Sequence, residues 1–196
     1  MTRSFDLFRA GDLVAAPWKN GGGSTREIAA YPPGSSFDDF AWRVSIADVG
    51  ADGPFSRFPG IDRTIVLLDG NGMKLILDGA GEHRLDQPFE PFEFEGEAKV
   101  AAVLLDGPTR DFNLMVRREL SGGSLIVLHG PGDHAVDQDI RILFIARGRA
   151  ALTDGCERTE LGTHDSAVVH GGQLSLSVPE GAVVFAVALS NSKPGH

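Results

Sequence analysis

The chain has 196 residues, of which 42% are hydrophobic and 23% charged, and its formal net charge at pH 7 is −9. This composition is typical of a soluble globular protein that buries its core without disulfides or structural metals. An acidic chain without a basic block is poorly suited to a phosphate backbone, so we expect no nucleic-acid partner.

The single cysteine, Cys156, excludes an internal disulfide and fits a reducing compartment. No stretch approaches the 18 apolar residues of a membrane span, and the first residues lack the apolar run of a signal peptide. We therefore expect a cytoplasmic protein that does not contact a membrane.

The first half of the chain predicts short strands separated by turns. Residues 4–16 predict a strand and then one helical turn capped by Asp12. Asp69-Gly70-Asn71-Gly72 predicts a hairpin turn. The later strands of this half are expected at Ser24–Tyr31, Phe40–Val49, Arg63–Leu68, Met73–Asp78, Ala98–Leu105 and Asp111–Arg118.

The second half of the chain likewise predicts short strands separated by turns, because its glycines recur at short spacing and it has no amphipathic helix of three turns. Such spacing favours an all-β sandwich or barrel. A boundary near residues 119–123 predicts two jelly-roll halves, 1–120 and 121–196. The strands of the second half are expected at Leu125–Leu128, Ile140–Ala146, Ala150–Leu152, Ser166–Val169, Leu174–Val178 and Val183–Leu189.

Residues 17–27 hold three consecutive glycines among cations, an amide and hydroxyls. Glycines allow positive φ and a close approach of another group, so this stretch predicts one wall of a ligand pocket, with Lys19, Asn20 and Arg26 as anion-binding groups. The alternative is a long loop with solvated cations. In the strand that follows, Arg26, Ile28 and Ala30 are expected to share a face.

Polar side chains fall on single faces of three expected strands. Arg43 and Ser45 share a face, Arg63 lies in register with apolar residues, and Asn113 and Met115 share a face. An arginine on an inward face must be paired or liganded, and its planar donors suit a carboxylate.

The alternative is that Arg43 and Arg63 form ion pairs with Asp48, Asp62 or Asp111, or face water. For a metal, the six histidines include no His-x-His pair, and we expect no metal and no cofactor. The sequence also contains no Gly-x-Ser-x-Gly elbow, so we expect no serine nucleophile.

Four motifs together resemble the HutD/Ves family: Pro17–Gly23, Trp42–Ala47, Gly53–Arg63 and Asp111–Met115. The resemblance covers residues from about 5 to 190. It implies a double cupin, an all-β fold of two jelly-roll barrels, without the cupin metal motif. It also implies a role in bacterial histidine utilisation as a non-catalytic modulator that binds urocanate or N-formylglutamate.

The leading hypothesis is therefore a small-carboxylate-binding regulatory protein with its pocket in the first half. Its expected ligand-binding residues are Trp18, Lys19, Asn20, Arg43, Ser45, Phe55, Ser56, Arg63, Asn113 and Met115. The second hypothesis is a metal-independent cupin isomerase or hydrolase with Asp111 or Asp62 as its base. The third is a purely structural or interaction protein, and a homodimer is compatible with each of them.

Overall fold

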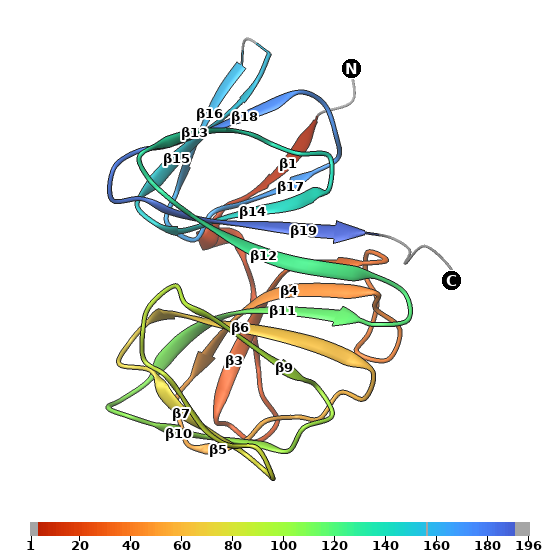
Figure 1. Ribbon diagram of the computed structural model, residues 1–196, viewed down its shortest axis with the longest axis vertical. Coiled ribbons are helices and arrows are strands. Elements are labelled where there is room, and N and C mark those ends of the chain that lie inside the picture. The colour runs from red at the N-terminus through yellow and green to blue at the C-terminus, as the bar shows by residue number, and fades with distance from the viewer. Residues whose placement is uncertain (1–3, 156, 191–196) are drawn as a thin grey trace. The chain divides into compact units, whose positions relative to one another are not determined.

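The computed structural model describes residues 4–155 and 157–190, which form two compact units of β-strands (Figure 1). We call residues 14–122 the N-terminal barrel, and residues 4–13 with 123–190 the C-terminal barrel. Besides the strands, the described residues contain one 3-10 turn at Ala10–Asp12. Each unit has two antiparallel sheets and a core of its own.

The N-terminal barrel consists of a six-stranded and a four-stranded sheet. The larger sheet has the order β2 (Ala15–Pro17), β3 (Gly23–Tyr31), β4 (Trp42–Val49), β11 (Thr109–Arg117), β6 (Ile61–Asp69) and β9 (Pro91–Glu95). The smaller sheet has the order β5 (Gly53–Pro54), β10 (Val100–Leu104), β7 (Met73–Leu77) and β8 (Gly81–Leu85). Apolar side chains of both sheets, such as Leu67 and Leu75, meet in one buried cluster, so the sheets enclose a common interior.

The C-terminal barrel repeats this arrangement. One sheet has the order β1 (Phe5–Phe8), β17 (Ser166–Val169), β14 (Ile140–Arg147), β19 (Val183–Ser190) and β12 (Gly122–His129). The other has the order β13 (Gly132–Ala135), β18 (Leu174–Val178), β15 (Arg149–Asp154) and β16 (Glu157–Gly162). The core between them is built from aliphatic side chains such as Leu143, Ile145, Leu176 and Val184.

The first strand of the chain belongs to the C-terminal barrel. β1 pairs antiparallel with β17, from Phe5 opposite Val169 to Phe8 opposite Ser166, and Figure 1 shows the two strands side by side. The 3-10 turn that follows is attached to the same barrel, because the Asp165 carboxylate accepts hydrogen bonds from the Ala10 amide and the Arg9 guanidinium. The expected division at residue 120 separates these partners.

Each strand expected from the sequence is present, but one expectation about pairing and one about a shared strand face are wrong. Residues 69–72 form a turn, yet β6 and β7 belong to different sheets, so the turn connects the sheets instead of closing a hairpin. A β-bulge between Glu27 and Ala29 places Arg26 opposite Ile46 and Ala30 opposite Arg43. Because the bulge changes the alternation, Arg26 and Ala30 lie on opposite faces of the sheet.

Gly23 explains part of the glycine run. It opens β3 opposite Val49, and a Cβ atom at this position would lie 2.2 Å from the Asp48 carbonyl oxygen and 2.9 Å from the Trp18 ring. Both distances are shorter than any real carbon contact allows, and one neighbour is backbone that has little freedom to move. The Trp18 ring lies against the strand because the residue at position 23 has no side chain.

We expect Gly23→Ala to lower the free energy of unfolding by about 1–3 kcal/mol, because the added methyl overpacks the contact with Trp18 and Asp48. Urea unfolding followed by circular dichroism measures this change. Gly53→Ala is the matched control, since a Cβ atom there meets nothing within 4 Å. Equal unfolding midpoints for the two variants would show that the close approach of Trp18 does not depend on Gly23.

Candidate functional site

The register of three neighbouring strands arranges polar side chains in layers inside the N-terminal barrel. On β11, Met115 lies opposite Arg43 of β4 on one side and opposite Arg63 of β6 on the other. One layer further, Asn113 lies between Ser45 and Ile65. Since alternate residues of a strand share a face, these groups lie on the same inner face as the core residues of β4 and β6.

Arg63 is the charged group at the centre of this arrangement. The residue is 9% exposed, and its Nη2 donates a hydrogen bond to Asn113 Oδ1 at 3.0 Å. Its Nε has no hydrogen-bond acceptor, and no carboxylate among the described residues forms an ion pair with it. Burial lowers the pKa of Arg63 to about 10, so the guanidinium keeps its charge at neutral pH.

Aromatic rings surround the Arg63 guanidinium. Its Cζ lies 4.9 Å from the ring centroid of Phe94, 5.3 Å from that of Phe55 and 5.7 Å from that of Phe58. The faces of aromatic rings attract cations, so the rings partly compensate for the water that Arg63 loses. They leave the Nε donor without an acceptor.

Arg43 differs from Arg63 because it has an acidic partner. Its Nε donates to Glu27 Oε2 at 2.7 Å, and the two side chains are 12% and 41% exposed. The bulge in β3 brings Glu27 opposite Ser45 and thus toward the inner face. Glu27 was not among the site residues expected from the sequence, because a bulge leaves no sequence signal as plain as alternation.

Asp111 lies deeper on the same face of β11, between Ala47 and Leu67 in register. It is fully buried, with Oδ1 accepting a hydrogen bond from the Thr109 hydroxyl at 3.1 Å. Its other oxygen, Oδ2, has no partner. The barrel interior therefore holds a buried guanidinium, that of Arg63, and a buried carboxyl group, that of Asp111. Each has one polar atom without a hydrogen-bond partner.

The structure brings six of the ten expected site residues together and leaves four elsewhere. Arg43, Ser45, Phe55, Arg63, Asn113 and Met115 share the barrel interior. Of the other four, two form hydrogen bonds within the chain and two are exposed to solvent. Trp18 donates to Thr25 Oγ1 at 2.8 Å and packs on the core, Asn20 Oδ1 accepts from the Gly22 amide at 3.0 Å, and Lys19 and Ser56 are exposed.

The glycine loop lies at the opposite end of β4 from Arg43. Gly23 pairs with Val49, six residues along the strand from Arg43, which corresponds to about 20 Å. Lys19 and Asn20, in the same loop, therefore lie apart from the Arg63 cluster. Sequence reasoning grouped them with the arginines because both motifs are rich in polar donors.

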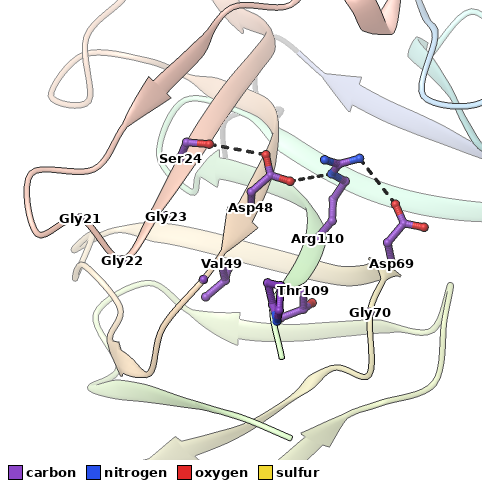
Figure 2. A pocket seen from close by; sticks show the side chains of 12 residues that line it. Gly21, Gly22, Gly23, Ser24, Asp48, Val49, Asp69, Gly70, Thr109 and Arg110 are labelled. Atoms are coloured by element: carbon purple, nitrogen blue, oxygen red, sulfur yellow. Dashed lines mark hydrogen bonds and ion pairs between the residues drawn. The ribbon is translucent and has the colours of Figure 1, made fainter. Parts of the chain in front are cut away.

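An open pocket of about 590 Å³ lies beside the glycine loop (Figure 2), and its lining residues do not include Lys19, Asn20 or Arg26. Figure 2 shows the Asp48 carboxylate between Ser24 and Arg110, with Arg110 extending toward Asp69. The pocket is lined by Gly21, Gly22, Gly23, Ser24, Asp48, Val49, Gly50, Asp69, Gly70, Pro108, Thr109 and Arg110.

The charges at this pocket are already paired. Arg26 forms an ion pair with Asp48, and Arg110 Nε donates to the other Asp48 oxygen at 2.7 Å. Burial alone would raise the pKa of Asp48, but the hydrogen bonds and charges of Arg110 and Arg26 lower it below its ordinary value. Because Arg63 lacks such a partner, the barrel interior is the stronger candidate for binding an anion.

The alternative ion pairs of Arg43 and Arg63 with Asp48, Asp62 or Asp111 are not formed in the described residues. Asp62 instead pairs with Arg118 at 2.6 Å. No group of three or more histidine, cysteine or acidic residues in the described ranges could hold a metal ion. None of the described residues belongs to a helix that could cross a membrane.

Comparisons with known proteins give a consistent picture. The HutD family model matches residues 10–186. An uncharacterized 21.2 kDa protein encoded in the hutC 3' region of Pseudomonas putida is 39% identical over 84% of this chain and 86% of its own length. Protein Ves of Cronobacter sakazakii is 48% identical over 52% of this chain and 55% of its own length.

A solved structure of HutD from Pseudomonas fluorescens SBW25, described as a formate condition, has a TM-score of 0.82 and 34% identity. It covers 96% of this chain and 100% of its own. The double-cupin fold is confirmed by more distant structures, such as a salicylate 1,2-dioxygenase from Pseudoaminobacter salicylatoxidans, with a TM-score of 0.66 and 9% identity. That match covers 94% of this chain and 81% of the dioxygenase. The chain belongs to the HutD family, which is associated with histidine utilisation.

Proposed function

We propose that this chain is a non-catalytic binding protein for a small carboxylate and that it modulates histidine catabolism. The observation that carries the proposal is the buried Arg63 guanidinium, which has no carboxylate partner among the described residues. A buried charge without a partner is strongly unfavourable, and an anionic ligand would supply what the chain lacks.

The neighbours of Arg63 support the choice of a carboxylate over other anions. The free Nε–H belongs to the planar fork of donors that binds the two oxygens of a carboxylate in parallel. Asn113 fixes the guanidinium from one side, and Ser45, in the same layer as Asn113, offers a hydroxyl. Phe55, Phe58 and Phe94 provide apolar walls for the rest of the ligand.

The association of the family with histidine utilisation suggests which carboxylates to test first. Urocanate and N-formylglutamate are intermediates of histidine breakdown, and each carries at least one carboxylate. The Arg43–Glu27 pair is close to neutral as a unit, so it suits a polar, uncharged end of the ligand better than a second strong anion. Both compounds belong in the first titration.

Asp111 supports a second candidate, a metal-independent isomerase or hydrolase that acts on the same ligand. Burial raises the pKa of Asp111 to about 7; the Thr109 hydrogen bond opposes this shift and the Asp48 charge adds to it. An inward carboxyl that titrates near neutral pH, with an oxygen free of partners, is suited to proton transfer.

Calorimetric titration with urocanate, N-formylglutamate, histidine, glutamate and formate tests the first proposal, with each mixture then analysed for product. Selective binding of one pathway carboxylate without product is the expected result. Binding followed by product would favour the enzyme. The absence of binding to all five compounds would overturn the carboxylate site.

We expect Arg63→Met to weaken carboxylate binding at least tenfold, because a hydrogen-bonded ionic contact contributes about 1.5–3 kcal/mol. The same variant should unfold at an equal or higher urea concentration, since it removes an unpaired buried charge. Arg84→Met, at an arginine whose side chain is 63% exposed, is the control and should bind as the native chain does. A structural arginine would give the opposite pattern, with lower stability and unchanged binding.

We also expect Asp111 to make the free energy of unfolding fall as the pH rises from about 4 to 7. Over this range the folded chain keeps the Asp111 proton while the unfolded chain, with a pKa near 3.8, releases it. The total effect is about 4 kcal/mol at most, and it is complete above pH 7.

Asp111→Asn lacks this titration, so its stability relative to the native chain should increase steadily between pH 4 and 7. Urea unfolding at pH 4.5, 5.5, 6.5 and 7.5 measures the difference. A constant difference across these four values would mean that Asp111 does not titrate near neutral pH.

A further inference from the structure

The segment between β3 and β4 carries an aromatic ring onto the arginines of the site. The Arg43 Cζ lies 4.4 Å from the ring centroid of Phe37. The Phe37 ring also stacks on Phe58, with centroids 5.5 Å apart and planes at 23°. Since the Phe58 ring lies against the Arg63 guanidinium, Phe37 is one member of a continuous row of contacts that runs from Arg43 through Phe37 and Phe58 to Arg63.

The backbone on both sides of Phe37 is held in place. The Ala41 amide donates to the Tyr31 carbonyl at 2.6 Å, which closes the base of the segment. The Arg117 guanidinium donates to the carbonyl oxygens of Asp38 and Phe40, each at 2.9 Å. These bonds place Phe37 at a defined position over the barrel.

The ring itself makes two weak contacts, the cation–π contact with Arg43 and the stack on Phe58. Phe37 is 51% exposed, so much of its side chain is in contact with solvent. A cation–π contact and a ring stack are individually weak, and rotation about the Phe37 side-chain bonds breaks both of them without moving the backbone. Hydrogen bonds thus fix the backbone of the segment, whereas the Phe37 ring is free to rotate about its side-chain bonds.

We propose that Phe37 is the gate of the Arg63 site. In the free chain its ring lies across Arg43 and Phe58 and restricts access to Arg63. It turns aside to admit a small solute and returns over it. That the solute is a carboxylate rests on the proposed function, whereas the gating of Arg63 does not.

The ligand-independent test is the rate at which phenylglyoxal, an arginine-specific reagent, modifies Arg63, measured by peptide mass spectrometry. In Phe37→Ala the rate at Arg63 should rise about tenfold relative to the exposed Arg84 of the same molecule. Phe37→Tyr keeps the ring and should react as slowly as the native chain. Ile76→Ala removes another exposed apolar side chain, 37% exposed, and should have no effect.

An equal Arg63 rate in Phe37→Ala and the native chain would overturn the gate. A general acceleration at all arginines would also overturn it, because that result indicates unfolding.

Titration of the same variants with the five compounds named above separates the gate from the proposed function. Faster Arg63 modification in Phe37→Ala, together with a native chain that binds none of the five, would support the gate and refute the carboxylate site. Carboxylate binding together with an unchanged modification rate would support the site and refute the gate. If both proposals hold, Phe37→Ala should bind and release the carboxylate faster than the native chain.

Discussion

The burial of the Arg63 charge governs the chemistry of the N-terminal barrel. A guanidinium removed from water needs compensation, and here three aromatic rings and the Asn113 oxygen supply only part of it. The surrounding charges do not supply the rest, since Glu27 is engaged with Arg43 and burial favours the neutral form of Asp111 below pH 7. The interior is therefore short of one negative charge, and this shortage is the basis for the anionic ligand proposed above.

The two barrels share an architecture but not this chemistry. In the C-terminal barrel, the inward positions of β14 are aliphatic, with Leu143 and Ile145 in the core. In the N-terminal barrel, the inward positions of β4 begin with Arg43 and Ser45 before they become apolar. The strand order thus determines where the interior of each barrel lies. The residues at a few inward positions determine whether that interior is only an apolar core or also contains polar groups suited to binding.

Alternation along β4 and β11 was enough to predict from the sequence that Arg43, Ser45, Asn113 and Met115 face the interior, because both strands pair without a register shift at these residues. Glu27 could not be found in this way, since the bulge beside it breaks the alternation. The loop residues Lys19 and Asn20 were grouped with the arginines because nothing in the sequence gives their distance along the sheet. Pairings that depend on distant segments, such as β1 with β17, leave no local pattern at all.

That pairing of β1 also determines how the chain completes its fold during synthesis. The first strand leaves the ribosome early, but its partner β17 is made only after the N-terminal barrel and most of the C-terminal one. Until then β1 has no partner, because β17 is its only neighbour in the sheet, and an unpaired strand is prone to pair with other chains. Strands from near both ends of the chain, β1 and β19, thus belong to one sheet, and in a fragment that begins after residue 13 the edge of this sheet would be β17 in place of β1.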